Sequence, residues 1–519
     1  MRNKNEQGMA LILALILVLV LSVMAVSLLF VARTDTWSSM NYRAMTRGRY
    51  AAESGISATA NFLMFNYAPP GAASDPITSY DTTKSPVTLA GNATPVALAA
   101  SGSTAPNGNT YPSSSVRSAF QAAAAGTLSG GNTSASSTYT PYATLLSMKQ
   151  FNAYPGSIPT TIQTWEITSD GDVAGIRKAR VEVSAVLERE ASPVFAYAAF
   201  ATSNGCGALG FGGGGTTDSY DSSQYAGSGS VSLQNSGGNV GTNGNLAASG
   251  SKTTINGSLS TPRAGVGSCS SSSVTALSTN GNATVTGGVT ELPQPIVYPP
   301  PPAPSPAPPQ TGMSVQKKAD CTGVPNCSAS GTDTIITGGS TSNPTLLGNL
   351  SVNSGAVLHF APPASYSPGS NPNSPNPVVF NINSVSFTGN ATVQIDPIPG
   401  TTPAQYAPIL LNFAGTGVST PIDFTGGTIA NPTLNSGLFQ IQYAGTGNVV
   451  LTGGAGAAGV LYAPNASVKF TGGGDWYGAV ISQYVTDLGG AAIHYDRHLQ
   501  TEYFMAGPFI LSTFNWKSF

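Results

Sequence analysis

The few residues that could carry metal or acid–base chemistry lie near the C-terminal end of the chain. Among 519 residues there are only 3 His and 4 Cys. His494 and His498 flank Asp496 and could offer two nitrogens and a carboxylate to a metal, but structural Zn²⁺ usually takes four ligands and no fourth is evident. We therefore predict a packing or hydrogen-bonding role for this segment, and neither a metal nor a cofactor.

A second candidate is Asp475-Trp476-Tyr477, where aromatic rings could stack on a sugar beside a carboxylate. Glycoside hydrolysis uses a pair of carboxylates, so a lone one is a weak signal. The other Asp residues are dispersed, whereas Ca²⁺ takes about six to eight oxygen ligands. We predict a turn whose aromatic residues cover the core, with Asp475, Trp476 and Tyr477 facing a ligand as the alternative.

Other catalytic patterns are weaker still. Gly454, Gly456 and Gly459 form a G-x-G-x-x-G, which binds a dinucleotide only between a strand and a helix. The run Val460–Pro464 that follows is typical of a strand and ends at a Pro, so we reject a dinucleotide site. The sequence also lacks a P-loop, an H-E-x-x-H and a G-x-S-x-G, which favours a non-catalytic protein.

The four cysteines are Cys206, Cys269, Cys321 and Cys327. Their spacing does not suit zinc, and an exported chain forms disulfides. Four cysteines allow three pairings. Because Cys321 and Cys327 could close a small loop, we favour that pair, which leaves Cys206 with Cys269.

Composition limits the class of protein. Charged residues make up 8% of the chain, against about 25% in ordinary soluble domains. With a net charge of −2 there is no basic surface to neutralise phosphates, so nucleic acid is excluded as a partner. The 61 Gly and 38 Pro are typical of a turn-rich β protein outside the cell.

The N-terminal segment must anchor whatever follows it. After a polar stretch, residues 9–32 contain no charge and would form a helix of about 36 Å, enough to cross a hydrocarbon core of about 30 Å. A signal peptide has an apolar stretch of only about 7–15 residues. No Pro occurs before Pro69, so we predict one helix over 9–67, partly in the membrane.

The polar leader that ends in Gly8, the apolar run from Met9 and RGRYAAESGI at 47–56 resemble type IV prepilins, most closely PilX-like minor pilins. The resemblance implies cleavage between Gly8 and Met9 by a prepilin peptidase, and methylation of the new N-terminus. It implies a single-pass precursor in the bacterial inner membrane, and later the extracellular pilus. Its partners would be other major and minor pilins and the inner-membrane assembly platform.

One position departs from the major pilins. They carry Glu at the fifth mature position, where this chain has Leu13. That carboxylate offsets the buried amino terminus of a neighbouring subunit, because an unpaired charge in apolar surroundings is costly. The first subunit of a filament has no earlier neighbour, so Leu13 fits a tip or initiating subunit.

The part of the chain that follows the N-terminal helix is predicted to be mostly β structure. Two alternating runs within 161–189, around Ser169-Asp170-Gly171-Asp172, predict a β-hairpin, while the low-complexity stretch 69–140 predicts a loop-rich insertion of low order. A phrase Asn-Ala-Thr/Ser-Val recurs from Asn282, Asn390 and Asn465. Short strands between Gly/Asn turns predict a right-handed parallel β-helix, with a β-sandwich as the alternative.

The C-terminal stretch 459–499 resembles the β-helical domain that often follows a PilX-like N-terminus. The matching pieces are YAPNA (462–466), GGGDWYGA (472–479) and HYDRHL (494–499), and TTDSYDSS (216–223) resembles the start of the same domain. Ten of the 17 residues in Pro293–Pro309 are Pro, which predicts a stiff polyproline II spacer between two halves of this domain.

The fold class expected is thus α+β, mostly β: a long pilin-type helix with a small antiparallel sheet, followed by the β-helix. The predicted divisions are a leader at 1–8, a helix at 9–67, a pilin-like module at 68–190, the first β-helical part at 191–292, a Pro-rich insertion at 293–330, and the main β-helical domain with its tail at 331–519.

The function expected is that of a non-catalytic minor pilin at the filament tip, active in pilus assembly. Adhesion to surface glycans, or to host or abiotic surfaces, is a weaker expectation. The alternatives are a membrane-anchored β-helix enzyme acting on polysaccharide, and the tip pseudopilin of a secretion system.

Overall fold

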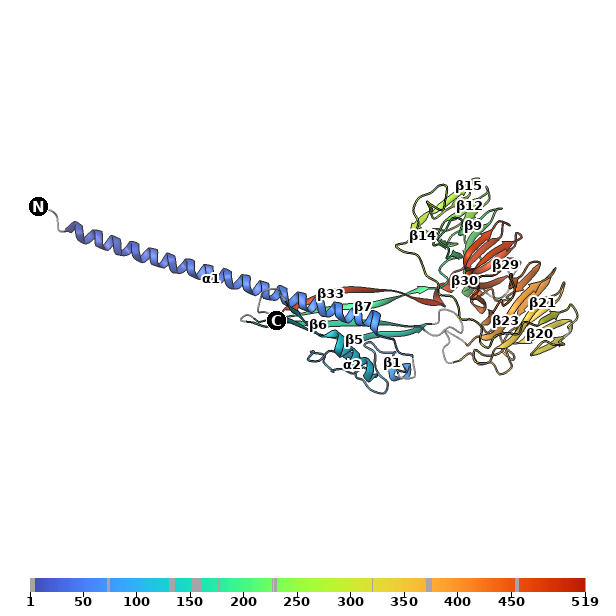
Figure 1. The fold of residues 1–519 in the computed structure, drawn as a ribbon, viewed down its shortest axis with the longest axis horizontal. Coiled ribbons are helices and arrows are strands. Elements are labelled where there is room, and N and C mark those ends of the chain that lie inside the picture. The colour runs from blue at the N-terminus through green and yellow to red at the C-terminus, as the bar shows by residue number, and fades with distance from the viewer. Residues whose placement is uncertain are drawn as a thin grey trace. The chain divides into compact units, whose positions relative to one another are not determined.

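Two units share the chain in the computed structural model (Figure 1). The structure describes residues 5–71, 75–129, 136–151, 160–175, 178–225, 227, 231–319, 321–369, 376–452 and 457–518. The helix–sheet unit comprises residues 1–150, 161–191 and 506–519, and the β-helix unit comprises residues 151–160 and 192–505. The fold is α+β and mostly β, as predicted.

The helix–sheet unit is a long helix packed on an antiparallel sheet, with the strand order β3-β5-β6-β7-β33. Its elements are α1 (Asn5–Asn61), the π-helical turn η1 (Phe62–Asn66), η2 (Ile77–Ser79), β1 (Tyr80–Asp81), β2 (Thr88–Leu89), β3 (Ala97–Ala99), α2 (Ser114–Ala124), β4 (Gly126–Ser129), β5 (Ser136–Phe151), β6 (Thr160–Val173), β7 (Ala179–Pro193) and β33 (Phe504–Ser518).

Helix α1 changes character along its length. Every residue of Met9–Arg43 is exposed. From Ala44 onward a stripe of small or apolar residues is buried, at the three- and four-residue spacing of a helix face that packs on a sheet. This stripe contains Ala44, Gly48, Ala51, Ala52, Gly55, Ile56 and Ala60. The first half of α1 is therefore not covered by any part of the chain that the structure describes.

The predicted hairpin is present, but its turn lies elsewhere. Strand β6 runs through Asp170-Gly171 to Val173, and Gly171 pairs with Val181 of β7. A Cβ atom on Gly171 would lie 1.9 Å from the carbonyl oxygen of Gly48 and 2.6 Å from the backbone nitrogen of Ala52. The sequence prediction of a turn at Asp170-Gly171 is wrong because this glycine permits close packing of α1 on the sheet rather than a chain reversal.

The stretch 69–140, predicted to be a loop-rich insertion of low order, supplies part of the core in its described residues. It forms α2 and four of the short strands. Phe120 of α2 is fully buried, and so is Tyr111, whose hydroxyl donates to Asp75 Oδ2 at 2.6 Å. The low-complexity background of Ala, Ser and Thr hides these few aromatic anchors, so the prediction was wrong.

The β-helix unit is built from short strands stacked in parallel register. They are β8 (Ala199–Ala201), β9 (Leu209–Phe211), β10 (Thr216–Tyr220), β11 (Val240–Thr242), β12 (Leu246–Ser249), β13 (Thr254–Ile255), β14 (Leu259–Thr261), β15 (Leu277–Asn280), β16 (Thr284–Val285), β17 (Val289–Glu291), β18 (Gly312–Val315), β20 (Asp333–Thr337), β21 (Thr345–Val352), β22 (Val357–Ala361), β23 (Val378–Phe387), β24 (Ala391–Ile395), β25 (Ile409–Phe413), β26 (Ile422–Asp423), β27 (Gly427–Ala430), β28 (Phe439–Tyr443), β29 (Asn448–Thr452), β30 (Ala458–Thr471), β31 (Asp475–Asp487) and β32 (Ala492–Asp496). Strand β19 (Cys327–Ser330) pairs antiparallel with β20, and η3 (Ser222–Gln224), η4 (Ser436–Leu438) and η5 (Arg497–Thr501) are short 3₁₀ turns.

Parallel register excludes the alternative of a β-sandwich, whose sheets are antiparallel. Two copies of the recurring phrase, at Asn282 and Asn390, lie at corners that lead into β16 and β24, whereas Asn465 lies within β30. Asn282 and Asn390 have φ of +64° and +53°, a left-handed conformation that Asn tolerates. The Ala that follows each of the three Asn residues is buried, so the apolar residues of successive turns lie over one another.

The first strands of the β-helix unit in chain order lie in the middle of the stack, not at one of its ends. Strands β8–β10 have β11–β13 on one side and β31 with β32 on the other. The chain winds outward from β8 to β17, passes to β18 at the far end, and winds back until β31 and β32 close against the strands where it began. The first and last strands of the unit are thus neighbours.

The Pro-rich segment makes the crossing between the two ends. Asn243 exchanges two hydrogen bonds with the backbone of Ile296, Tyr462 donates to the Pro299 carbonyl at 2.6 Å, and Asn381 donates to the Pro306 carbonyl at 2.8 Å.

The length of this segment matches the stack beneath it. Six strand-to-strand steps separate β11 from β23, which is about 29 Å at about 4.8 Å per step. Polyproline II geometry would span about 28 Å between Ile296 and Ser305, the residue before Pro306. The prediction of a spacer is corrected: the segment is a strap held along the β-helix, and its own Tyr298 is buried against Phe200 and Tyr462.

The end of the chain also differs from the expectation. Residues 506–518 do not form a tail of the β-helical domain, because β33 is an edge strand of the sheet in the helix–sheet unit. Strand β33 pairs with β7 there, and the Arg189 guanidinium donates to the Gly507 carbonyl at 3.2 Å. Backbone pairing of this kind leaves little trace in the side-chain pattern of a 15-residue segment.

Candidate functional site

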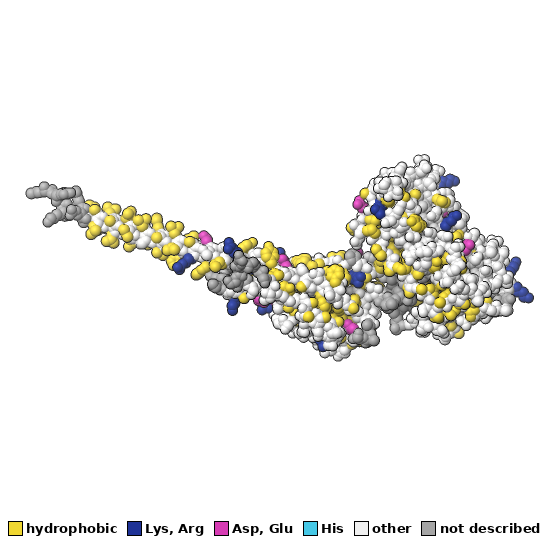
Figure 2. All heavy atoms as spheres, in the orientation of Figure 1, with side chains coloured by type: hydrophobic (Ala, Val, Ile, Leu, Met, Phe, Trp, Pro, Cys, Tyr) yellow, Lys and Arg dark blue, Asp and Glu magenta, His cyan; other side chains and the backbone are white. Residues whose placement is uncertain are grey.

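The N-terminal half of α1 is a continuous exposed apolar surface (Figure 2). Its large apolar side chains between Met9 and Val31 are 43 to 70% exposed, including Leu13 at 64%. Among the described residues, one helix is long and apolar enough to cross a membrane, and it contains this segment. Monomeric soluble proteins rarely expose such a patch, which marks a surface for lipid or for another protein.

The predicted cleavage position lies at the start of this surface. Gly8 and Met9 are consecutive residues of α1, and Leu13 lies just over one turn beyond Met9. No charged residue occurs between Met9 and Arg33. The surface therefore has no carboxylate with which to pair a neighbouring amino terminus.

Two motifs far apart in the sequence meet in the β-helix. Strand β10 pairs in parallel with β32, so that Asp218 lies beside His494 and Tyr220 beside Asp496. Strand β31 lies on the other side of β32, with Tyr477 beside His494. The similarity of both TTDSYDSS and HYDRHL to one domain therefore has a physical basis, because the first and last strands of the stack are neighbours.

His494 is held between two carboxylates. Its Nδ1 lies 2.5 Å from Asp218 Oδ1, and its Nε2 lies 3.5 Å from Asp475 Oδ1. The Tyr477 ring lies over the imidazole, with centroids 4.6 Å apart. His494 is only 4% exposed, so of this cluster chiefly Asp475, whose side chain is 48% exposed, is open to solvent. These contacts fix the orientation of the imidazole. They also link β10, near the start of the β-helix unit, to β31 and β32 at its end.

The alternative of a ligand-facing Asp475-Trp476-Tyr477 is wrong for Trp476. This residue is fully buried and meets Phe470 edge-on in the core, with ring centroids 6.2 Å apart. Strand alternation explains the difference, since neighbours on one strand point to opposite faces. Asp475 and Tyr477 share the outer face, and the two-residue periodicity is the signal that could have separated them from Trp476.

Asp496 is a buried acceptor that joins three turns. Its carboxylate is fully buried and accepts from the backbone nitrogens of Ser222, Ser436 and His498, and from the Ser436 hydroxyl, at 3.0 to 3.3 Å. Burial raises the pKa of this carboxyl above its usual value. His498 lies in η5, and its Nε2 is 3.1 Å from Glu502 Oε1. The segment 494–498 thus has the packing and hydrogen-bonding role predicted for it.

Several titrating groups of the β-helix unit share one direction of pKa shift. Burial raises the pKa of Asp487 to about 6, and its Oδ2 has no partner among the described residues. The hydrogen bond to Asp396 raises the pKa of His359, and the hydrogen bond to Glu502 raises that of His498.

We expect the free energy of unfolding of this unit to fall as the pH rises from about 4 to 8. A raised pKa in the folded state means that the folded state binds more protons, so stability decreases with pH. Asp487 contributes up to about 3 kcal/mol to the free energy of unfolding for a pKa shift of this size. This contribution is complete below pH 3.8 and lost by about pH 6. The histidine contributions are present below about pH 6.5 and lost above it.

Urea unfolding followed by tryptophan fluorescence at pH 4.5, 6 and 8 measures this trend. Asp487→Asn should flatten the part of the profile between pH 4.5 and 6. A midpoint that rises with pH across this range would contradict the assignment.

The cysteines pair as the sequence analysis favours. Cys206 is bonded to Cys269, and Cys321 to Cys327, with Cα atoms 5.7 and 5.4 Å apart. Of the rejected glycine motif, Gly454 and Gly456 lie outside the described residues, and Gly459 lies in β30.

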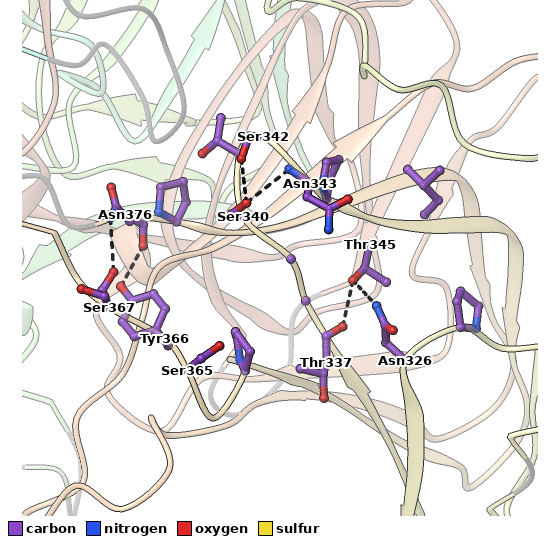
Figure 3. A pocket seen from close by; sticks show the side chains of 18 of the residues that line it. Asn326, Thr337, Ser340, Ser342, Asn343, Thr345, Ser365, Tyr366, Ser367 and Asn376 are labelled. Carbon is purple, nitrogen blue, oxygen red and sulfur yellow. Dashed lines mark hydrogen bonds between the residues drawn. The ribbon is translucent and has the colours of Figure 1, made fainter.

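A large cleft that the sequence does not single out lies among the loops beside β19–β23 (Figure 3). It has a volume of about 1350 Å³ and is lined by Ser, Thr, Asn and Pro residues with Tyr366 and Leu346. These residues come from a Ser/Asn/Pro-rich background that carries no motif, so no pattern pointed to them.

Comparisons with known proteins bear on two parts of the chain. Residues 7–57 match the family described as PilX N-terminal. Residues 412–502, which hold Asp475, His494 and Asp496, match a domain of unknown function, DUF7305. A search of the curated proteins finds no match. The resemblance of the N-terminal segment to PilX-type minor pilins is thereby confirmed.

A solved structure, the competence-associated pilin ComZ from Thermus thermophilus, is also similar to this chain. The identity is 13%, and the alignment covers 92% of this chain and 98% of that one. Its TM-score is 0.27, too low to support an argument about shared structure.

Proposed function

We propose that the chain is a non-catalytic minor pilin that enters a type IV pilus through α1 and displays the β-helix unit outside the cell. The observation that carries this proposal is the exposed apolar surface of Met9–Val31 within the segment of PilX type. Lipid first covers this surface in the inner membrane, and the helices of neighbouring pilins cover it later. Both environments are apolar, so the transfer costs little hydrophobic free energy.

The proposal includes processing and position. A prepilin peptidase cuts between Gly8 and Met9, the new N-terminus is methylated, and an inner-membrane assembly platform receives the mature chain. Leu13 offers no carboxylate to a neighbouring amino terminus, which favours the tip or initiating place in the filament. We expect immunogold label against the β-helix unit at filament ends, whereas label spread evenly along the shaft would contradict the tip position.

Entry into the filament depends on an uncharged helix. We expect Val20→Arg to reduce the amount of protein in sheared filaments at least tenfold, because a charge in the middle of the span costs about 2.5–3.5 kcal/mol in a membrane. Tyr42→Arg, on the exposed part of α1 beyond the apolar span, is the matched control and should enter normally. Immunoblots of sheared filaments and of membranes measure both variants.

The same filaments test the processing. The mature protein should begin at Met9 by mass spectrometry. A product beginning after residue 20 would mean that the helix had been removed, and would contradict the proposal. Recovery only from a secretion system's pseudopilus would favour the alternative of a tip pseudopilin.

A second candidate function is cleavage of polysaccharide by a membrane-anchored enzyme. The observation that favours it is the pair Asp218 and Asp475 on either side of His494. Because His494 and Asp218 are buried, we infer that the cluster holds the strands together instead. New reducing ends or unsaturated products from a panel of polysaccharides incubated with the protein would decide for the enzyme.

A further inference from the structure

The cleft of Figure 3 is built by three segments of the β-helix unit. Residues 325–328 lead into and begin β19, residues 337–346 connect β20 with β21, and residues 363–367 and 376–377 lie between β22 and β23. Its volume of about 1350 Å³ exceeds the range of about 300–1,000 Å³ that is usual for sites of small ligands. The space therefore suits an extended ligand of several linked units.

None of the described residues that line the cleft is charged. The polar ones are hydroxyl and amide side chains, which both donate and accept hydrogen bonds. Phosphate and carboxylate ligands are normally held by Arg or Lys, and a positively charged ligand would require carboxylates. A neutral ligand with many hydroxyl groups fits this lining.

Hydrogen bonds within the wall hold several of its polar side chains in place. Asn326 Nδ2 donates to Thr345 Oγ1 at 2.9 Å, and Thr345 in turn donates to the Thr337 carbonyl at 2.9 Å. On the opposite wall the Tyr366 hydroxyl donates to the Asn376 carbonyl at 2.7 Å. Figure 3 shows these side chains around the cleft.

Other groups in the wall are free to meet a ligand. Ser365 is exposed, and its hydroxyl makes no hydrogen bond to any residue that the structure describes. The ring of half-buried Tyr366 adds an apolar face next to this hydroxyl. Aromatic faces beside hydroxyl groups suit sugar rings, which are apolar on their faces and polar at their edges.

Prolines, a disulfide and backbone hydrogen bonds restrict the backbone of the walls. Pro325, Pro344, Pro363 and Pro377 line the cleft, and Cys327 is held to Cys321 by a disulfide. Ser340 and Asn343 exchange two backbone hydrogen bonds at 3.2 Å across the intervening turn. A site that is ordered before binding loses little conformational entropy when the ligand enters.

We propose that this cleft binds a neutral oligosaccharide, and that it is the adhesive site of the displayed unit. The inference rests on the proposed function for its biological setting, since display on a filament brings the cleft to surface glycans. Binding itself does not require the filament. A peptide is less suited, because Leu346 and Tyr366 are the main apolar side chains in the described lining besides the prolines.

The test uses the full-length protein in detergent micelles and isothermal titration calorimetry. The probes are neutral hexasaccharides of α-1,4-glucose, β-1,4-glucose, β-1,4-xylose and β-1,4-mannose, with hexagalacturonate and a mixture of hexapeptides as comparators. We expect at least one neutral hexasaccharide to bind. Its affinity should be unchanged by added NaCl, because salt screens only interactions between charges.

Ser365→Trp, which fills the cleft from an exposed position, should weaken this binding at least tenfold. The matched control is Thr332→Trp, in the exposed turn between β19 and β20 and outside the cleft. Reduction of the Cys321–Cys327 disulfide should also weaken binding, because it loosens one wall. The thermal unfolding midpoint of each variant shows that it is folded.

Four results would overturn the proposal: binding of none of the neutral probes, binding of only hexagalacturonate, binding of only the peptides, or equal affinity in Ser365→Trp and Thr332→Trp. Failure of the glycan assay with normal recovery in sheared filaments contradicts only the cleft. Normal glycan binding without entry into filaments contradicts only the proposed function.

Discussion

Replacement of Gly171 by Val is expected to unfold the helix–sheet unit or to detach α1 from its sheet. A Cβ at this position would lie 1.9 Å from the Gly48 carbonyl oxygen and 2.6 Å from the Ala52 nitrogen, and both atoms belong to the backbone of α1. A rotamer change cannot relieve such a contact. Overpacking in a core typically costs about 1–3 kcal/mol and occasionally more, and we expect at least about 3 kcal/mol here because the helix as a whole must move.

The measurement is hydrogen exchange of the full-length protein in detergent. Amides of β6 and of residues 44–61 should lose protection in Gly171→Val, while those of the β-helix unit keep theirs. Gly312→Val is the matched control, since a Cβ there meets nothing within 4 Å and Val suits its strand β18. If Gly171→Val unfolds within 1 kcal/mol of the unchanged protein, the close packing of α1 on β6 is refuted.

The second large effect is expected from Asp496→Ala in the β-helix unit. The substitution removes the acceptor of four hydrogen bonds and leaves the buried donors of Ser222 and Ser436 and the partly buried one of His498 unpaired. Each buried donor without a partner costs about 1–3 kcal/mol. We expect a loss of at least about 3 kcal/mol, because the bonds join η3, η4 and η5 where the first and last strands of the stack meet.

A graded series separates this role from a general effect of lost charge. Asp496→Asn keeps one carboxamide oxygen as an acceptor and should fall between the unchanged protein and Asp496→Ala. Asp423→Ala is the control, since this half-buried carboxylate accepts only one backbone bond, from Thr425, among the described residues. Urea unfolding followed by tryptophan fluorescence orders the variants, and equal midpoints for Asp496→Ala and Asp423→Ala would contradict the proposed role.

Stability of the β-helix unit should therefore depend on the meeting of segments that are far apart in the chain. Residues 199–220 and 475–496 are neighbours in the stack, yet the second segment follows the first by more than 250 residues. Non-local pairing of this kind is slow because the loop-closure entropy must be overcome first. The Pro-rich strap reduces that entropy, because its stiff backbone already has the length that the crossing requires.

The sequence by itself determined the features that depend on local pattern. An uninterrupted apolar run predicts the helix and its exposed half, alternation in β6 and β7 predicts a hairpin, and recurring Asn-Ala-Thr/Ser-Val predicts a stack of short strands. The PilX-type N-terminus and the preferred disulfide pairing belong with these. Each of these features follows from periodicity, residue type or short spacing. Residues close together in the sequence are enough to define such patterns.

Only the tertiary structure decided what the same residues meet across the fold. Asp170-Gly171 has the composition of a turn, yet it lies within a strand because the backbone of α1 occupies the space that a side chain would need. Trp476 is buried because its strand alternates, β33 joins a distant sheet through its backbone, and the Pro-rich segment is a strap because its length matches the stack. The cleft is made by three segments of the β-helix unit that lie apart in the sequence. Contacts between distant segments depend on shape and on backbone hydrogen bonds, and a linear pattern of side chains records neither.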